Sequence, residues 1–294
     1  MAAPALTTRL SSTGPLLMLV AVGCIALDTL LVRLVSSHIH PLEIVFFRSL
    51  FGLVAVVPHL LRHKLRGIAT GRLPMHTVRA AFKIAGLVLL FAAIARLPLA
   101  LVTVIAFTTP LFICLGSVLF LGERLRTPRV VALVLGFVGV LVAVRPGVAP
   151  MDLGIVMAIG SALVIAGVML IMKFLSVREP PPTVVSINLL LMLPLTLPFM
   201  AFVWVTPSPE ALGLLFLSGA LSGVAQLSAS TAMSMTDVSI LAPIDFLRLP
   251  MVALLAWTFL GETTDLATVL GGTMIFAGTL GLILGERRHP VEPV

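Results

Sequence analysis

The stretch Leu97–Arg124, LPLALVTVIAFTTPLFICLGSVLFLGER, decides the fold of this chain. Its apolar part runs for about twenty residues, the length that an α-helix needs to cross a bilayer. It holds Pro110 near its middle and closes with the motif FLGE at 120–123, which returns 139 residues later at 259–262. The same offset aligns other residues of the chain, namely Phe107 with Phe246, Ala93 with Ala232, Gly139 with Gly278 and Pro41 with Pro180. We therefore interpret the chain as one membrane unit, duplicated.

The composition is that of a membrane protein. Of the 294 residues, 59% are hydrophobic and 11% are charged, whereas a soluble domain averages about 25% charged residues. The net charge of +7 does not indicate nucleic-acid binding, because the basic residues lie in short loops, where membrane topology explains them. We expect the lipid bilayer as a partner and no nucleic acid. Cys24 and Cys114 both fall inside apolar runs, so we expect no structural disulfide.

Ten apolar runs predict ten transmembrane helices, at 15–35, 41–61, 76–96, 99–121, 129–145, 152–174, 184–205, 211–233, 238–260 and 265–284. Proline and glycine at 145–150 break the chain between two groups of five helices. We expect one repeat in residues 10–148 and the second in residues 149–287. Long apolar spans joined by short connections favour an all-α bundle over a β-barrel.

The basic residues predict the orientation in the membrane. One set of alternate connections holds Arg9, Arg62, Lys64, Arg66, Arg72, Arg124, Arg126, Arg129, Lys173, Arg178, Arg287 and Arg288. The opposite side holds only Arg96 and Arg145. Because basic loops stay inside, we expect a multi-pass protein of the cytoplasmic (inner) membrane with both termini cytoplasmic.

The two repeats are predicted to be inverted. A repeat of five helices reverses the direction of the second copy, and the Gly-Glu corner supports this. Basic residues follow Glu123, whereas the residues after Glu262 are threonines and an aspartate. Inverted repeats characterise secondary transporters, whose substrate site lies near the midplane between the copies. The predicted fold is an all-α membrane protein with ten transmembrane helices as two inverted five-helix repeats around a central cavity, either a monomer or a homodimer.

Several short motifs of this chain recur in a known family. They are HPLEIVFFR at 40–48, LPLA at 97–100, TPLF at 109–112, GER at 122–124, GFVGV at 136–140, RPG at 145–147, LAP at 241–243 and FLGE at 259–262. In these motifs, and over about residues 15–285, the sequence resembles the EamA-type branch of the drug/metabolite transporter superfamily.

The resemblance implies a ten-helix carrier in which the first four helices of each half surround the cavity, while the fifth and tenth helices lie outside it. Relatives export amino acids and similar metabolites, or move riboflavin, S-adenosylmethionine or nucleotide sugars. Asp245-Phe246 stands where the riboflavin- and S-adenosylmethionine-like members are expected to carry Glu-Tyr. This difference argues against those two substrates.

Six ionisable residues stand out within the predicted spans, and their charges sum to zero: Asp28, Arg33, Glu43, Arg48, Asp245 and Arg248. Each costs about 2.5–3.5 kcal/mol at the bilayer centre, so such residues usually face the interior and pair. The first two spans form a hairpin centred near His38, which places Asp28 opposite Arg48 and Arg33 opposite Glu43. We predict both as interhelical ion pairs. Either the pairs fix the hairpin register, or Arg48 binds a substrate carboxylate while Asp28 takes a proton or an ammonium group.

The ninth predicted span carries Asp245 and Arg248, three residues apart on one helix face. They either satisfy each other or line the cavity near the midplane. Pro110 and Pro250 each remove a backbone donor deep in corresponding helices. The carbonyls that they free either bind substrate or act as hinges, unless the two breaks are static kinks.

Aromatic and polar residues complete the candidate site. Phe107 and Phe246 occupy equivalent positions and either pack or clamp a substrate side chain. Thr103 shares helical spacing with Phe107, and Gln226 is too polar to face lipid. The predicted substrate-binding residues are therefore Asp28, Arg48, Thr103, Phe107, Pro110, Gln226, Asp245, Phe246 and Arg248.

Other features are interpreted as structural. Gly219 and Gly223 form a small-xxx-small face that permits close helix approach. Glu123 and Glu262 each precede a new helix, where a carboxylate can meet the N-terminal amides.

These features predict a secondary transporter that moves small metabolites by alternating access. Amino acids are the first substrate class that we predict, and the resemblance implies export. Uptake of a larger metabolite such as riboflavin or S-adenosylmethionine is the alternative. A membrane-embedded enzyme is disfavoured, because the chain lacks His-Glu-x-x-His, a paired-aspartate diphosphate motif and a Gly-rich phosphate loop. A passive channel would give fluxes that do not saturate. We expect no cofactor, no catalytic residue and no metal site.

Overall fold

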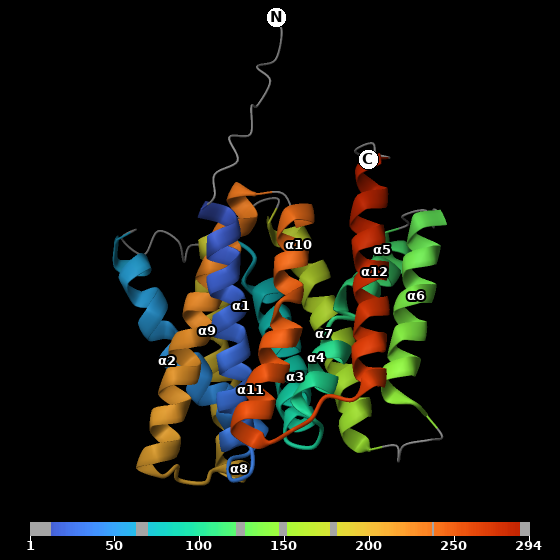
Figure 1. Cartoon of the computed structure of the whole chain (residues 1–294). Coiled ribbons are helices and arrows are strands. Elements are labelled where there is room, and N and C mark those ends of the chain that lie inside the picture. Colours follow the sequence, from blue (N-terminus) through green and yellow to red (C-terminus); the bar gives the residue numbers. More distant parts are fainter. Residues whose placement is uncertain are drawn as a thin grey trace, which may run out of the picture.

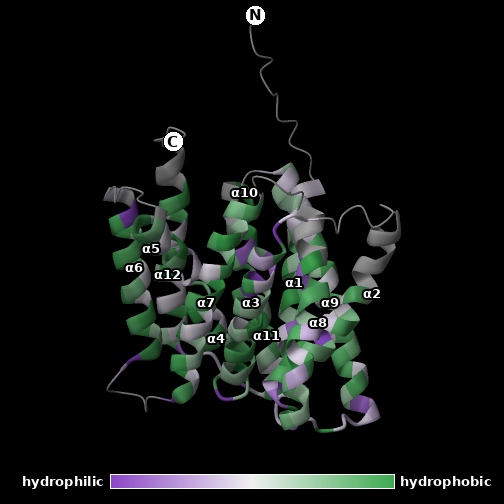
Figure 2. Cartoon of the chain, turned by 180° about the vertical axis from the view of Figure 1, so that it is seen from behind, coloured by the Kyte–Doolittle hydropathy of each residue, from purple (hydrophilic) through white to green (hydrophobic). Residues whose placement is uncertain are grey.

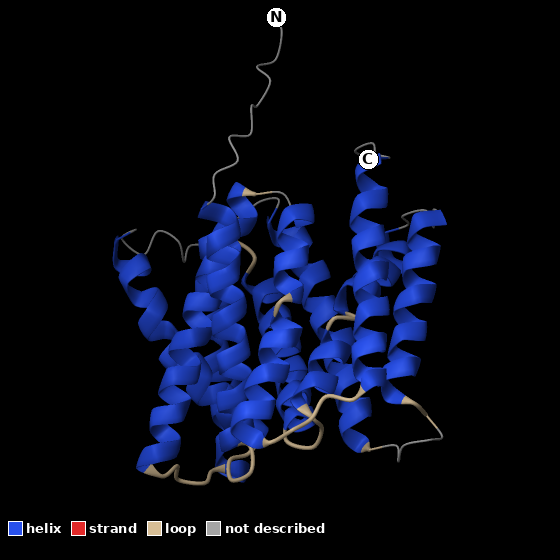
Figure 3. Cartoon of the chain, in the orientation of Figure 1, coloured by secondary structure: helices blue, strands red, loops and turns tan. Residues whose placement is uncertain are grey.

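A computed structural model describes residues 13–62, 70–121, 127–146, 152–176, 181–236 and 238–288. Within these ranges the regular secondary structure is helical (Figure 3). The helices are α1 (Thr13–Val35), α2 (Pro41–Arg62), α3 (Leu73–Ile94), α4 (Leu99–Ala106), α5 (Thr109–Leu121), α6 (Thr127–Val144), α7 (Leu153–Ser176), α8 (Pro181–Val203), α9 (Pro209–Met235), α10 (Val238–Phe246), α11 (Arg248–Leu260) and α12 (Leu266–Arg288). Each predicted span corresponds to one helix, except that the spans 99–121 and 238–260 each contain two.

The helices have the surface of a membrane protein. Seven helical segments in the described ranges are long and apolar enough to cross a bilayer, and α4–α5 and α10–α11 each count as one segment among them. Large apolar side chains such as Phe120 and Phe202 are more than 80% exposed on the outside of the bundle. A soluble monomer rarely exposes so much contiguous apolar surface. In Figure 2 hydrophobic residues follow the helices along their length, and many of the hydrophilic ones lie at the ends of the bundle.

The helices stand roughly side by side in one bundle (Figure 1). Helix α1 begins and helix α12 ends at the same end of the bundle. Helices α6 and α12 pack together at one edge, and α2 lies at the opposite edge. Helix α9 packs against both α1 and α2, and α3 packs against α7 and α8. The resemblance placed the fifth and tenth spans outside the cavity, and α6 and α12 do lie at an edge.

Glycine allows α6 and α12 to approach closely. A Cβ atom at Gly139 would lie 2.7 Å from the carbonyl oxygen of Gly271, and one at Gly278 would lie 2.9 Å from that of Ala132. Neither distance leaves room for a side chain. These glycines therefore serve contact between the last helices of the two halves.

The two interrupted spans break at equivalent places. Helix α4 ends at Ala106 and α5 begins at Thr109, while α10 ends at Phe246 and α11 begins at Arg248. Shifted by 139 residues, Thr109 falls on Arg248, so the second helix of each pair begins at the same repeat position. Figure 3 shows both interruptions as short loop segments inside the bundle.

Proline explains where the new helices begin. Pro110 is the second residue of α5, where a missing N–H costs nothing, because the first turn has no intrahelical acceptor for it. The carbonyl of Ala106 loses its helical donor, and the Thr109 hydroxyl donates to it instead, at 2.7 Å. The sequence analysis predicts that Pro110 leaves this carbonyl without a donor. In the structure the carbonyl of Ala106 does have a donor, because the Thr109 hydroxyl replaces the missing amide.

Candidate substrate site

The best-defined polar cluster in the interior joins α1, α2 and α9. Arg48 donates to Asp28 Oδ2 through Nη2 at 2.6 Å and through Nε at 3.1 Å. The hydroxyl of Ser218 donates to the other carboxylate oxygen, Oδ1. The side chains of Asp28 and Arg48 are only 7% and 18% exposed. The ion pair predicted from the hairpin register is present, and Ser218 adds a contact from the second half of the chain.

Close helix packing brings Ser218 to this pair. A Cβ atom at Gly219 would lie 3.0 Å from both the carbonyl oxygen of Arg48 and the amide nitrogen of Gly52. Only glycine allows α9 to cross α2 at this distance, as the small-xxx-small pattern predicted. On its other side, the Arg48 guanidinium carbon lies 5.5 Å from the centre of the Phe91 ring of α3. Four helices therefore surround the Asp28–Arg48 pair.

A second cluster lies where the two interrupted spans meet. The rings of Phe107 and Phe246 stack with centres 4.0 Å apart and planes 12° apart. The Arg248 guanidinium carbon lies 4.4 Å from the centre of the Phe107 ring, and Phe276 of α12 lies 4.2 Å from Phe246. The repeat positions predicted to be equivalent are thus in direct contact. The two rings touch each other, so a solute held between them would have to part them.

Arg248 is weakly partnered for a half-buried cation. Its Nη2 lies 4.0 Å from Asp245 Oδ2, at the outer limit of an ion pair, and its buried Nε has no hydrogen-bond partner in the described ranges. The predicted intrahelical contact is therefore present but loose. A loosely held guanidinium stacked on an aromatic ring retains donors for a ligand.

The remaining predicted site residues differ in their burial and in their hydrogen bonding. Thr103 is buried, and its hydroxyl already donates to the carbonyl of Leu99 at 2.8 Å. Pro110 is half-buried at the start of α5, and Gln226 is half-buried on α9. Neither Gln226 nor Thr103 contacts the Asp28 carboxylate, which Arg48 and Ser218 hold.

The predicted Arg33–Glu43 pair is wrong. Arg33 donates to Glu262 at 2.9 Å and to the carbonyls of Ile94 and Leu97. Glu43 is fully buried and accepts from the amide of Val205 at 3.2 Å. The hairpin places Arg33 and Glu43 at a similar depth, but each side chain turns to a group distant in sequence: Glu262 lies just after α11, and Val205 lies just after α8.

Glu262 does meet a helix N-terminus, although not that of the next helix. Its Oε2 accepts from the amide of Leu99 at the start of α4, at 2.9 Å. At the start of α12 the carboxylate is Asp265, which accepts from the amide of Thr268 at 3.0 Å. Glu123, the partner of Glu262 in the repeat, lies outside the described residues.

Sequence reasoning overlooked polar residues of α3 and α8. Arg79 is 3% exposed and Lys83 is half-buried on α3, although both lie within a predicted transmembrane span. Asn188 of α8 is 1% exposed, and both polar atoms of its amide lack a hydrogen-bond partner among the described residues. The available signal was the spacing of Arg79 and Lys83, four residues apart and therefore on one helix face.

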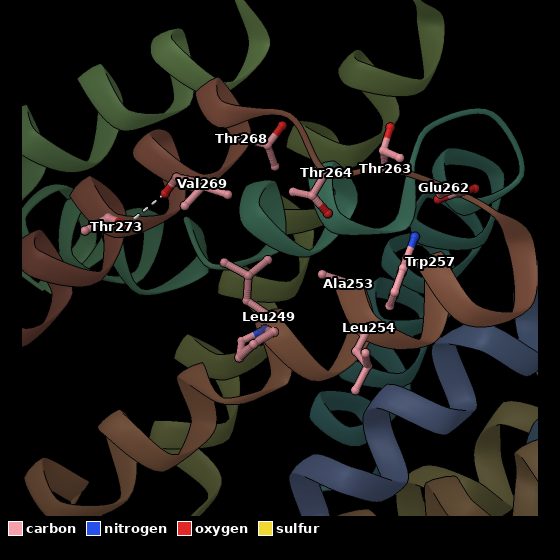
Figure 4. Close-up of a pocket in the computed structure, with 11 residues that line it drawn as sticks. Leu249, Ala253, Leu254, Trp257, Glu262, Thr263, Thr264, Thr268, Val269 and Thr273 are labelled. Carbon is pink, nitrogen blue, oxygen red and sulfur yellow. Dashed lines mark hydrogen bonds between the residues drawn. The ribbon is translucent and has the colours of Figure 1, made fainter.

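A separate pocket of about 560 Å³ lies between α11 and α12 (Figure 4). Its lining includes Leu249, Pro250 and Trp257 of α11 and Thr268 and Thr273 of α12. Glu262 is the one ionisable residue among those that line it. None of the nine predicted site residues borders this pocket, which is mainly apolar.

The helices form a membrane bundle with charged pairs in its interior. The protein is therefore a multi-span membrane protein with an internal polar site. The profile of the EamA-like transporter family matches residues 12–145 and again residues 152–284. The chain therefore belongs to the EamA-like transporter family, within the drug/metabolite transporter superfamily, and it is a membrane transporter.

Named relatives align over most of the chain. The pseudopaline exporter CntI of Pseudomonas aeruginosa is 31% identical over 93% of this chain and 96% of its own length. The S-adenosylmethionine uptake transporter of Rickettsia felis is 27% identical over 87% of both chains. The riboflavin transporter of Rhizobium johnstonii is 29% identical over 84% of this chain and 82% of its own length. A solved structure described as "Crystal structure of protein" shares the fold, with a TM-score of 0.65 and 18% identity over 95% of this chain and 99% of its own.

Proposed function

We propose that this protein is a secondary carrier that moves a small metabolite across the cytoplasmic membrane by alternating access. In this proposal ten spans form two inverted halves, residues 10–148 and 149–287, and both termini are cytoplasmic. The halves would rock about a site near the midplane, and we assign that site to the two clusters of charged residues. The main observation behind the proposal is the buried Asp28–Arg48 pair of the first half. Ser218, from the second half, donates a hydrogen bond to the Asp28 carboxylate of this pair.

An amino acid is the first substrate that we propose. The Asp28 carboxylate suits an ammonium group and the Arg48 guanidinium suits a carboxylate, so a zwitterion can exchange partners with the pair. The pair satisfies itself in the empty protein, and a ligand that replaces both partners leaves no charge alone in the interior. Asp245 and Arg248 offer a second, looser pair beside the stacked phenylalanines. We propose outward transport, in line with the resemblance.

The names of the relatives support a second substrate class. Uptake of a larger metabolite such as S-adenosylmethionine or riboflavin is the alternative, since transporters so named align over most of this chain. Asp245-Phe246 at the break between α10 and α11 favours the amino-acid proposal. One uptake experiment can test both substrate classes.

The test is uptake into proteoliposomes that contain the purified protein. Labelled amino acids, S-adenosylmethionine and riboflavin are offered with and without a pH gradient. We expect saturable uptake of an amino acid and its loss in Arg48→Ala and Asp245→Ala. Arg145→Ala is the matched control, because this arginine pairs with Asp265 at an exposed connection and its side chain is 46% exposed. Transport like that of the parent by both site variants would remove the site assignment, and uptake that never saturates would favour a channel.

A further inference from the structure

The two interrupted spans meet at one end of the bundle. Helix α4 begins at Leu99 and ends at the break after Ala106, and α11 begins at its break at Arg248 and ends at Leu260. These two segments pack against each other. Beyond the breaks, α5 packs chiefly against α7, and α10 packs chiefly against α1. The interrupted spans are therefore in contact with each other at the end where α4 begins and α11 ends, and with different helices beyond the breaks.

An ion pair fastens the tips of these two segments. Arg33 of α1 donates at 2.9 Å to Glu262, which lies just after the end of α11. The other carboxylate oxygen of Glu262 accepts at 2.9 Å from the amide of Leu99, the first residue of α4. Arg33 also donates to the carbonyls of Ile94 and Leu97, around the turn between α3 and α4. We call Arg33 and Glu262 the latch, because they join α1, α4 and α11 at one point.

This end of the two segments is closed in the structure. Leu97 in the turn before α4 and Leu99 at its start are at most 5% exposed, although connections between helices usually lie at the surface. About 12 Å further along α4, at a rise of 1.5 Å per residue, the stacked rings of Phe107 and Phe246 make a second contact between the two spans. A solute that leaves between α4 and α11 would have to pass both contacts.

The breaks allow the two segments to move. Neither span continues as a regular helix through its break (Figure 3), so α4 and α11 can each turn there without bending a continuous helix. The side chains of Arg33 and Glu262 are 24% and 18% exposed, so water already reaches both charges and can replace the latch contacts when the segments part.

The repeat indicates what the opposite arrangement would be. Shifted by 139 residues, α4 falls on α10 and α5 falls on α11. Exchanging the roles of the two halves therefore replaces the contact between α4 and α11 by a contact between α10 and α5, on the other side of the breaks. Inverted repeats of a transporter commonly alternate between two such arrangements.

We propose that α4 and α11 form a gate, which the latch holds shut and which opens by rotation of both segments about the breaks. This inference rests on the proposed carrier function, in which this end of the bundle faces outwards. In the open state Arg33 and Glu262 separate, α4 parts from α11, and α10 approaches α5. The structure is then the state that is closed to the outside.

The first test measures the exposure of a thiol behind the latch. Thr103→Cys is placed between Leu99 and Phe107 on α4, where the threonine is 5% exposed, and alanine replaces both native cysteines. The probe is hydroxyethyl methanethiosulfonate, which is uncharged, and the protein is held in nanodiscs. We expect Glu262→Gln to speed modification by about tenfold, because the closed state loses contacts that the open state does not have.

Two controls distinguish opening of the gate from other effects. Arg145→Gln removes an exposed ion pair with Asp265 and should leave the rate at Thr103→Cys unchanged. Native Cys114 of α5, 6% exposed, is kept as the single thiol in a second background, and it should stay protected in Glu262→Gln. Equal acceleration at Cys114 would indicate general loosening of the protein and would overturn the gate.

The second test locks the latch in the folded protein. Arg33→Cys/Glu262→Cys is linked with a bifunctional methanethiosulfonate that spans the two positions. Uptake of the labelled amino acids, S-adenosylmethionine and riboflavin into proteoliposomes should stop on linking and return after reduction. Arg145→Cys/Asp265→Cys, linked in the same way, should keep transporting, because α6 and α12 pack together through their glycines in any case.

The results separate the gate from the carrier function. A rate at Thr103→Cys that Glu262→Gln does not change, or saturable uptake that continues while the latch is linked, overturns the gate and leaves the carrier function in place. If the parent shows no saturable uptake, the carrier function fails, and the exposure of Thr103→Cys still supports or overturns the opening of α4 and α11.

Discussion

Removing both members of the Asp28–Arg48 pair should destabilise the protein by clearly less than the sum of the two single removals. In Asp28→Asn the guanidinium of Arg48, 18% exposed, keeps its charge but loses the carboxylate that accepts from two of its nitrogens. Breaking a buried pair in this way costs about 3–5 kcal/mol, because an uncompensated charge stays inside. Arg48→Gln leaves Asp28 with Ser218 as its remaining partner and should cost about 3 kcal/mol.

The double variant Asp28→Asn/Arg48→Gln removes both charges together. We expect it to be less destabilised than the sum of the single variants by about 2 kcal/mol or more, which is the coupling between groups in one ion pair. The assay is reversible unfolding in mixed micelles with increasing dodecyl sulfate, monitored by the fluorescence of the two tryptophans. The matched control is the Arg145–Asp265 pair, whose side chains are 46% and 40% exposed and which should show a coupling of at most about 0.5 kcal/mol. Additive effects at Asp28 and Arg48 would show that the two side chains are not coupled as an ion pair.

Three further predictions concern packing, contact between the halves, and topology. Gly219→Leu should lower the unfolding free energy by about 3 kcal/mol in the same assay, since its side chain would collide with the backbone of α2; wild-type stability would contradict the crossing of α2 and α9. Glu262→Gln should lower the unfolding free energy by about 2 kcal/mol, because it weakens contacts to Arg33 and to the start of α4. Adding Arg33→Gln to this variant should lower the unfolding free energy little further. Additive losses would count against the contact between Arg33 and Glu262. A reporter enzyme active only in the periplasm should stay silent when fused after Gly71 and work after Thr263, and activity at both sites would contradict the inverted arrangement.

Much of the architecture could be predicted from hydropathy and the repeat, because both are local or periodic properties. Each predicted span corresponds to a helix or to a pair of helices, with ends that differ by a few residues. The Asp28–Arg48 pair could be predicted because a short connection fixes the register of α1 against α2. The repeat identifies Phe107 and Phe246 as equivalent positions, but it does not predict that their rings stack on each other.

Contacts between distant parts of the chain could not be predicted in the same way. Arg33 has Glu43 close in sequence, yet it binds Glu262, 229 residues away, because the rotation of α1 about its axis depends on packing against several other helices. Ser218 could be recognised as polar, but its contact with Asp28 depends on how α9 crosses α2. Lys83 lies within an apolar span and has no acidic neighbour in sequence, so the sequence offers no pair that would indicate its place in the interior.

A transporter that carries its substrate by alternating access, as we propose for this protein, shows counterflow. Proteoliposomes are loaded with the unlabelled substrate found in the uptake screen and diluted into a trace of the labelled form. We expect a transient overshoot, in which labelled substrate inside the vesicles rises above its equilibrium level before it declines, and no overshoot with Arg48→Ala. A smooth approach to equilibrium in the parent protein, with no overshoot at any internal concentration, would contradict it.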